Sequence, residues 1–576
     1  MERCRKVDSA GRARLTCSLI SCFIFLLCTP LLFAQTGSAS DLLGQVQQLA
    51  EAKRWQEVIE LIERSGEGSP DLDFLKGTAL SRLGRWSDAR AAFQAGQKQR
   101  PHDKRFPEEL AGVAFHQKQY AAAVKHMRRA LALDSGDQYA NDFLGTVYFL
   151  EGNIPAALKF WNRVNKPLLQ QIQTAPKPRL DPVLLDHAFA FAPAAVLGES
   201  DFYTTEQRIR GLGIFSSYHL DLQAQPAGKF DVLFRNRELN GWGDTRYEAL
   251  FRVFRGLPFQ TIYPEYFNLG GKGINLVSLF RWDAQKRRVL GTLNAPFFRS
   301  PKYRYELTAD LRSENWDVLS SFTGPASFLG GFNIRREAVS ASFISTESGR
   351  WNWSASAELS HRDFRDVVPG AALASTLLEK GYQLKQSSQV NVELLRVPER
   401  RLTLSGSAGY ELGRLWSNAG ESFIKLQPAV NLHWFPRAQG DDYEMTQQVR
   451  AGKTFGDLPF DELFMLGVER DNDLWLRAHI GTRDGRKGSA PLGRNYFLSN
   501  WAVDKNVYSN GLLTIKVGPF LDTGKVTDPV SGLGSGKWLW DTGLQTKVRV
   551  FGVVVAFSYG KDLRSGNNAL YVSMQR

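Results

Sequence analysis

The side chains best suited to chemistry in this sequence are its eight histidines, since imidazole binds metals and transfers protons near neutral pH. Their spacing contains no His-Glu-x-x-His run or comparable metal-ligand pattern. There is no Gly-x-Ser-x-Gly nucleophile motif, and the stretch ending at Gly536 and Lys537 lacks the spacing and the Ser or Thr of a phosphate-binding loop. The acidic pair Asp461 and Glu462 is of a kind that arises often by chance. The sequence therefore predicts a protein that is not an enzyme, with no catalytic residue, no cofactor and no metal site. The histidines are His102, His116, His126, His187, His219, His361, His433 and His479.

Cysteine chemistry is confined to the N-terminus, where Cys4, Cys17, Cys22 and Cys28 all lie. If this segment is removed, the mature chain has no thiol. Disulfide scaffolds, cysteine-ligated zinc, iron–sulfur clusters and thiol nucleophiles are then excluded together.

Residues 1–34 have the order of a secretory signal: a basic stretch, an apolar run from Leu19 to Phe33, and small or polar residues from Ala34. We expect cleavage after Ala34, and an uncleaved anchor helix is the alternative. Cleavage removes five basic and two acidic residues, which lowers the net charge from +13 to about +10. A basic exported chain suits an acidic polysaccharide or an anionic membrane surface, whereas export argues against nucleic acid. The mature chain has no run of 18 apolar residues.

Residues 41–166 repeat with a period of 34. Small residues recur in two columns and large residues in others, so that paired helices approach closely and bulky side chains fill the gap between pairs. The positions resemble the tetratricopeptide repeat, and the alternative is a generic helical bundle. The resemblance implies a concave surface that binds a client protein or a periplasmic protein. The packing positions are Gly77, Ala89, Phe93, Ala111, Ala123, Gly145, Ala157 and Trp161.

Residues 176–240 are predicted to form a small α+β module. Prolines mark a linker, and a helix-like segment then leads through Leu212 and Gly213 into two strands, one of them over Phe230 to Phe234. The run resembles the second half of a POTRA domain, whose first half is here shorter than expected. A degenerate copy or an unrelated linker domain is the alternative.

From residue 245 to residue 576 the hydrophobic period changes to two. Runs beginning at Tyr303, Trp351 and Leu402 alternate apolar with polar residues for about ten positions, long enough to cross a bilayer as tilted strands. About 320 residues at roughly 20 per strand and connection predict about sixteen strands in a closed transmembrane barrel. A soluble β-sandwich or solenoid is the alternative.

The last 120 residues carry the most specific motifs, among them "LPFDELFMLG" at 458–467, "FLDTG" at 520–524 and "WDTGLQTKVRV" at 540–550. Their order and spacing resemble the barrel of the BamA/TamA-like bacterial surface antigen superfamily, which includes two-partner secretion transporters. In that family an extracellular loop folds back into the barrel and its arginine pairs with acids of the inner wall. The resemblance implies this role for Arg477, with Asp522 and Asp541 as the wall acids. The tip departs from the family pattern, since Ala478 and His479 stand where glycine and an aromatic residue are usual.

The sequence thus predicts a multidomain outer-membrane protein: a periplasmic all-α repeat array, a short POTRA-like module, and an antiparallel barrel of about sixteen strands embedded in outer-membrane lipid. The resemblance implies insertion or translocation of client proteins. Two other functions remain open, namely a polysaccharide export porin and a scaffold that the barrel anchors.

Overall fold

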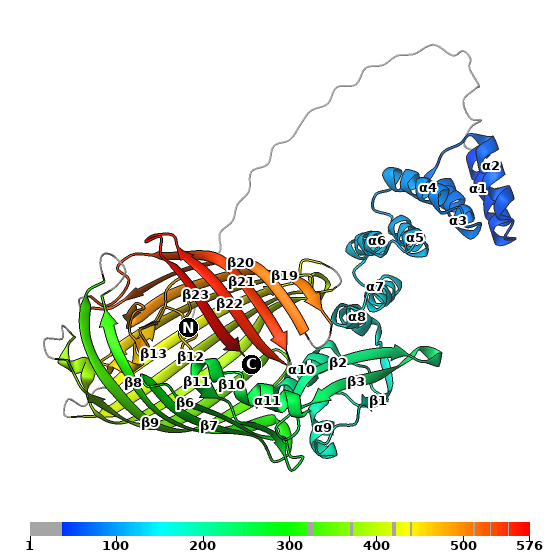
Figure 1. Cartoon of the computed structure of the whole chain (residues 1–576). Coiled ribbons are helices and arrows are strands. Elements are labelled where there is room, and N and C mark those ends of the chain that lie inside the picture. Colours follow the sequence, from blue (N-terminus) through cyan, green and yellow to red (C-terminus); the bar gives the residue numbers. More distant parts are fainter. Residues whose placement is uncertain are drawn as a thin grey trace, which may run out of the picture. The chain divides into compact units, whose positions relative to one another are not determined.

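The computed structural model describes residues 37–243, 245–320, 326–368, 373–417, 422–437, 440–510, 513–529, 532–550 and 552–575 (Figure 1). The predicted signal segment and all four cysteines lie outside these residues. The chain divides into two compact units between Leu133 and Asp134.

The first unit consists of antiparallel helix pairs, as the 34-residue period predicts. Within a pair the helices approach closely because small residues face large ones. A Cβ atom added at Gly77 would lie 2.6 Å from the ring of Phe93, and Ala89, Ala111 and Ala123 are fully buried. The six helices are α1 (Gly37–Glu51), α2 (Trp55–Ser65), α3 (Pro70–Arg82), α4 (Trp86–Gln99), α5 (Arg105–His116) and α6 (Tyr120–Leu133).

The turn between the helices of a pair requires one residue with a left-handed backbone. Gly84 has φ +75° between α3 and α4, and Gly152 has the same φ in the third predicted repeat. Lys118 occupies the equivalent position in the second repeat with φ +57°. Glycine adopts this conformation without steric cost, whereas lysine does not.

The second unit begins with α7 (Gln138–Leu150) and α8 (Ile154–Trp161), so the division falls inside the predicted repeat range and not at residue 166. The reason lies in the packing of this last helix pair. The Trp161 ring covers Gly145, and Trp161 and Phe149 pack on Phe230 of the following module, with ring centroids 5.1 and 5.7 Å apart.

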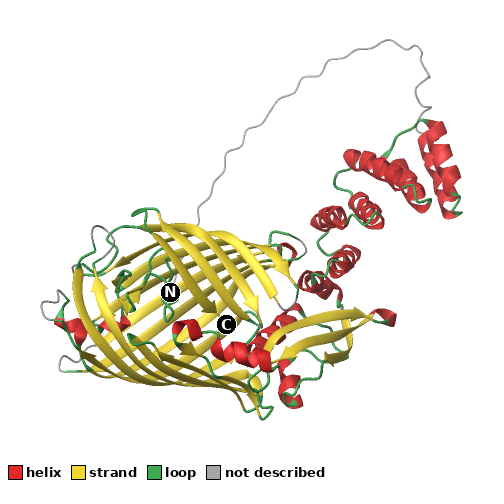
Figure 2. Ribbon diagram, viewed as in Figure 1, coloured by secondary structure: helices red, strands yellow, loops and turns green. Residues whose placement is uncertain are grey.

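The module that follows has the order β1 (Leu168–Ala175), α9 (Pro182–Ala188), α10 (Glu199–Leu212), β2 (Phe215–Ala224) and β3 (Lys229–Glu238). Its sheet has the order β1-β3-β2, with β1 parallel to β3 (Figure 2). The predicted start at residue 176 misses β1, since this strand lies before the prolines that were interpreted as a linker. The sheet of the module therefore begins at β1.

A helix, α11 (Arg246–Phe254), occupies the predicted start of the barrel at residue 245. The Thr245 hydroxyl caps it by accepting a hydrogen bond from the Glu248 amide. Inside the fold, Glu248, Arg252 and Glu265 form a chain of buried ion pairs. The first barrel strand begins only at Thr261.

The rest of the second unit is a closed antiparallel barrel, as the period-two pattern predicts (Figures 1 and 2). In the described part of the chain sixteen strands form its wall, and β4 and β5 both pair with β6. The strands are β4 (Thr261–Ile262), β5 (Glu265–Leu269), β6 (Ile274–Trp282), β7 (Lys286–Phe297), β8 (Ser300–Leu319), β9 (Phe328–Thr346), β10 (Trp351–Arg365), β11 (Gly381–Val397), β12 (Leu402–Trp416), β13 (Ser422–Trp434), β14 (Tyr443–Gly456), β19 (Asn495–Ser509), β20 (Leu513–Thr527), β21 (Leu539–Val550), β22 (Val553–Asp562) and β23 (Asn568–Gln575).

The two faces of the barrel wall differ in polarity. Large apolar side chains are exposed on the outside, while the alternate residues of the same strands are polar and partly or fully buried inside. A closed sheet with an apolar exterior satisfies its amides within hydrocarbon, so the barrel is of the transmembrane type. The exposed apolar residues include Leu276, Val289, Leu307, Leu311, Val339, Leu359, Leu384, Leu412, Ile424, Val430, Leu521, Leu544 and Phe557.

Among the described helices, none has the length and apolar character needed to cross a membrane.

Most connections between strands at one end of the barrel are shorter than those at the other. The turns at 347–350, 398–401 and 551–552 are short, while the connections at 366–380 and 457–494 on the opposite end are long. The POTRA-like module and the last helix pair contact the end with the short turns.

Candidate functional site

The connection between β14 and β19, residues 457–494, folds back against the inner wall of the barrel; we call it the lumen loop. It contains η6 (Phe460–Glu462) and four two-residue strands, β15 (Phe464–Met465), β16 (Thr482–Arg483), β17 (Arg486–Lys487) and β18 (Leu492–Gly493). Lys487 in β17 pairs with Trp316 of β8, and β14 pairs directly with β19. The wall therefore continues past the loop, which lies inside it.

Acidic residues at the start of the lumen loop meet a group of wall cations. Asp461 lies 3.0 Å from Arg362 and 3.2 Å from Arg336, and Glu462 lies 2.6 Å from Lys425. These are the two carboxylates that sequence reasoning set aside as a chance pair. Their partners lie between 37 and 125 positions away along the chain, so no local pattern could have identified them.

A second group of ion pairs holds the middle of the loop to β6, β7 and β8. Asp471 accepts hydrogen bonds of 2.7 Å from both Arg281 and Arg288, and Lys487 donates one of 2.7 Å to Glu314. All five side chains are buried or nearly so. Buried pairs of this kind cost much to break, because the remaining partner is left in a site without water.

Arg477 is the most completely bonded side chain of the loop. Its Nε and Nη2 atoms donate to the two oxygens of Asp522, at 2.9 and 2.6 Å, so the pair is bidentate. Nη1 donates to Gln545, Nη2 also donates to the Trp501 carbonyl, and the guanidinium lies 3.8 Å from the centre of the Phe520 ring. The structure thus brings Arg477 together with the first of the two wall acids expected from the sequence.

The second expected wall acid, Asp541, binds the neighbouring residues of the tip instead. Its Oδ2 atom accepts hydrogen bonds from the Ala478 amide at 2.7 Å and from His479 Nδ1 at 3.0 Å. The residues at which the tip departs from the family pattern are therefore the ones that meet Asp541. No histidine spacing in the sequence points to this contact, because the three groups come from a loop and a distant strand.

Apolar contacts complete the attachment of the lumen loop. Phe460 packs edge-on against Trp316 and Phe332, with ring centroids 5.0 and 4.8 Å apart. Ion pairs and aromatic contacts together join the loop to strands β6 to β11, β13 and β20 to β22, so it is held on most sides of the lumen.

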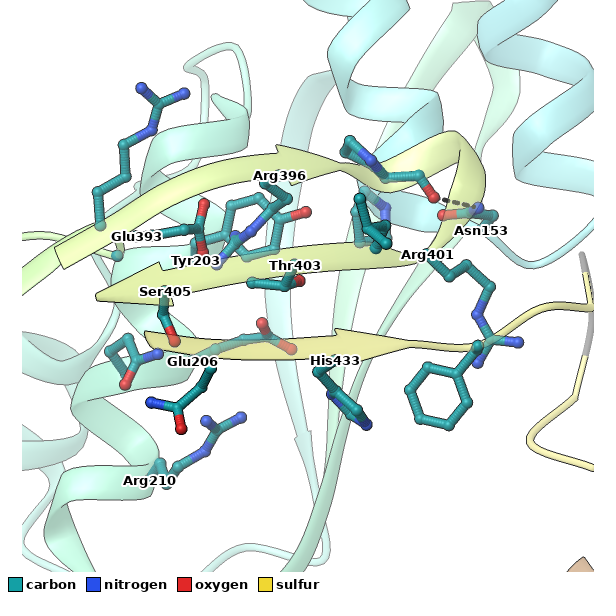
Figure 3. A pocket seen from close by; sticks show the side chains of 18 of the residues that line it. Asn153, Tyr203, Glu206, Arg210, Glu393, Arg396, Arg401, Thr403, Ser405 and His433 are labelled. Atoms are coloured by element: carbon teal, nitrogen blue, oxygen red, sulfur yellow. Dashed lines mark hydrogen bonds and ion pairs between the residues drawn. The ribbon is translucent and has the colours of Figure 1, made fainter. Parts of the chain in front are cut away.

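The end of the barrel with short turns contains a separate polar cavity of about 790 Å³. Figure 3 shows its walls: Tyr203, Glu206 and Arg210 come from α10, and Arg396, Thr403 and His433 come from β11, β12 and β13. Burial raises the pKa of the Glu206 carboxyl and of the Tyr203 hydroxyl. The cavity carries both signs of charge beside apolar groups, which suits a polymer with polar and apolar parts better than a small apolar ligand.

The last helix pair reaches the rim of this cavity. Asn153 donates a hydrogen bond of 3.0 Å to the Pro398 carbonyl, drawn as a dashed line in Figure 3. Lys159 pairs with the buried Glu399 at 2.8 Å. Both contacts fall on the short turn η5 (Pro398–Arg400) between β11 and β12. The predicted packing residues Ala157 and Trp161 lie in the same helix, α8, and are buried there.

Comparison with known proteins finds a family match in the repeats. The tetratricopeptide repeat family model matches residues 74–138. The chain therefore carries tetratricopeptide repeats, as their spacing predicts. No curated protein matches the chain.

Among solved structures, the chain is similar to BamA from Haemophilus ducreyi lacking POTRA domains 1–3, with 11% identity and a TM-score of 0.40 over 71% of this chain and 84% of that one. It is similar to CdiB from Escherichia coli, with 13% identity and a TM-score of 0.45 over 71% and 76%. For CdiB from Acinetobacter baumannii the identity is 11% and the TM-score 0.40 over 80% and 86%.

Proposed function

We propose that this chain is an outer-membrane transporter that inserts client proteins into the membrane or translocates them across it. In this proposal the repeats and the POTRA-like module lie in the periplasm and recruit the client or a partner protein. Bacterial outer-membrane barrels have short periplasmic turns and longer extracellular loops. The contacts of the module and the last helix pair with the short-turn end support this orientation.

One observation carries the proposal: the lumen loop is folded inside the barrel and joined to the wall through Arg477 and Asp522. A loop inside the lumen obstructs an open diffusion pore. A transporter that must stay sealed between clients needs such a loop, held firmly by contacts that persist until a client arrives. The buried ion pairs of the loop are of this kind.

The polar cavity beside α10 supports a route for the client. It lies where the module, the last helix pair and the strands β11 to β13 meet, so that a segment released from the repeats reaches the barrel mouth through it. Its mixed charges favour an unfolded polypeptide, whose backbone and side chains carry donors, acceptors and both signs of charge.

A polysaccharide export porin and a barrel-anchored scaffold are the competing functions. The basic net charge of +13 for the full chain is compatible with an acidic polymer. The loop inside the lumen argues against a polysaccharide route through the barrel, and a scaffold would not require a polar cavity at the mouth.

The decisive experiment is depletion of the protein from its own cell, with outer-membrane proteins, secreted proteins and surface polysaccharide quantified in parallel. We expect loss of other barrel proteins or of a secreted protein, with polysaccharide unchanged. Complementation with Arg486→Ala, a change at an exposed ion pair of the same loop, is the matched control and should restore the clients. An intact proteome with missing polysaccharide would replace the proposal by the export porin, and no change in any class would replace it by the scaffold.

A further inference from the structure

Three aspartates form a row across the inner wall of the barrel. Asp522 on β20 lies opposite Asp541 on β21, and Asp541 lies opposite Asp562 on β22. Two of them are fully buried and the third is 2% exposed. Carboxylates directly opposite one another on neighbouring strands repel, and burial strengthens the repulsion. Such a row persists only where positive charge faces it.

The tip of the lumen loop supplies part of that charge. The Arg477 guanidinium forms a bidentate ion pair with Asp522. His479 lies between the other two carboxylates, with Nδ1 3.0 Å from Asp541 and Nε2 3.8 Å from Asp562. One guanidinium and one imidazole face three carboxylates, so the described ion pairs of the row leave an excess of negative charge even when the histidine is protonated.

The cluster also contains a carboxylate oxygen that no hydrogen bond satisfies. Asp541 is fully buried, and its Oδ1 atom has no hydrogen-bond partner among the described residues. A buried acceptor without a partner is costly, and an ion that fills the site removes this cost. One ligand atom each from His479, Asp541 and Asp562 lies within 4.8 Å of the other two.

We propose that His479, Asp541 and Asp562 bind a divalent transition-metal cation of the zinc class. One imidazole nitrogen and two carboxylate oxygens form a ligand set that Zn²⁺ accepts, with water in the open position, whereas Ca²⁺ and Mg²⁺ prefer oxygen ligands alone. Two positive charges also remove the excess negative charge of the aspartate row.

The ion joins the loop tip to two strands of the wall. Arg477 attaches the tip to β20, and the metal attaches it to β21 and β22. The cation therefore provides a second attachment of the lumen loop to the barrel wall. Its ligands are scattered over 84 positions of the chain, which explains why the histidine spacing in the sequence predicts no metal site.

The test measures zinc binding by the full chain, purified in detergent without a histidine tag, stripped with a chelator and dialysed against ZnCl₂. We expect one tightly bound zinc per chain, and at least tenfold weaker binding in His479→Ala and Asp562→Asn. His433→Ala is the matched control, since it removes another histidine–carboxylate pair, with Glu444, for which the described residues give no third ligand. It should bind zinc as the unaltered chain does.

Heat-modifiable migration of the barrel on gels shows which variants are folded, and His479→Gln replaces the alanine variant if the latter does not fold. Co²⁺ provides a second readout, because its visible absorption changes when an imidazole ligand is lost. Absence of stoichiometric zinc in the unaltered chain, or equal affinity in the His479 variants, would overturn the proposal.

Discussion

At the scale of single residues, the lumen loop depends on charged groups that are buried in pairs. A paired charge inside a protein contributes little net stability, but removal of one partner leaves the other in a site that water cannot reach. Arg477 is the extreme case, since its guanidinium satisfies both oxygens of Asp522, a residue with no exposed surface.

We therefore expect Arg477→Ala to lower the free energy of unfolding of the barrel by about 3–5 kcal/mol. Arg477→Lys should recover only part of this loss, because an ammonium group cannot form the bidentate pair. Urea-induced unfolding in detergent or lipid vesicles, followed by tryptophan fluorescence, measures the difference. Arg486→Ala removes an ion pair with Asp317 that is largely exposed and should cost about 0.5 kcal/mol or less. Equal losses for the two alanine variants would contradict this account.

The buried carboxyl of Glu206 leads to a prediction about how folding stability depends on pH. Burial raises the pKa of its carboxyl above the usual value of about 4.3. An acid whose pKa is higher in the folded state than in the unfolded state destabilises the folded state when it is ionised. The free-energy cost of this charge is present above the folded-state pKa and disappears as the pH falls below the unfolded-state pKa. Glu206→Gln should therefore stabilise the second unit at pH 7.5 and have much less effect near pH 4.

Thermal unfolding at the two pH values, followed by far-UV circular dichroism, measures this difference. The exposed residue Glu67 provides a control of the same chemistry, and Glu67→Gln should change stability at neither pH. A stabilisation by Glu206→Gln that persists at pH 4 would show that the packing of the amide, and not the removal of charge, is responsible.

At the scale of helices and strands, the repeats and the lumen loop differ in the sequence separation of the residues in contact. In the repeats this separation is short and constant: Gly77 contacts Phe93 sixteen positions later, and Gly145 contacts Trp161 at the same interval. A period visible in the sequence therefore predicts both contacts. The contact of Glu462 with Lys425 joins a loop to a strand and follows no period. Only the resemblance of the C-terminal motifs suggested a loop inside the barrel.

The boundaries of elements were harder to predict than their types. Strand β1 was missed because it is one short strand followed by prolines, and its partner β3 lies about sixty positions later. Helix α11 was missed because its nine residues are too few for a helical period to stand out beside the long alternating runs. At Lys118 the sequence pattern does predict a turn. The evidence is the position of this residue in the 34-residue period, because lysine itself does not favour a turn.

The close helix contact at Gly77 gives a prediction at this scale. A methyl group at this position would meet the Phe93 ring at 2.6 Å, so Gly77→Ala should destabilise the repeats by about 1–3 kcal/mol through overpacking. Gly112→Ala is the matched control, because a Cβ atom there meets nothing within 4 Å and lies within helix α5. It should stabilise by roughly 0.5–1 kcal/mol. Thermal unfolding of the helical signal of the full chain compares the two, and a neutral Gly77→Ala would show that the helix pair can move apart.

At the scale of the whole barrel, we expect the lumen loop to determine whether ions pass. The inner wall carries a group of cations that faces acids at the start of the loop, where Asp461 and Glu462 pair with Arg336, Arg362 and Lys425. The wall also carries acids that face cations of the loop tip, as Asp522 does Arg477. Without the loop, wall charges of both signs would lose these partners and surround water, which opens a path for ions.

Replacement of residues 460–492 by a short glycine–serine linker should therefore convert a barrel with little steady conductance into one with a large conductance. The wall strands β14 and β19 pair directly with each other, so the barrel can close without the loop. Planar-bilayer recordings measure the conductance. Glu462→Gln in the intact loop is a milder variant; it should leave the loop in the lumen but weaken the attachment to Lys425, producing brief openings. A loop-deleted barrel that stayed silent would show that something other than the lumen loop obstructs the pore.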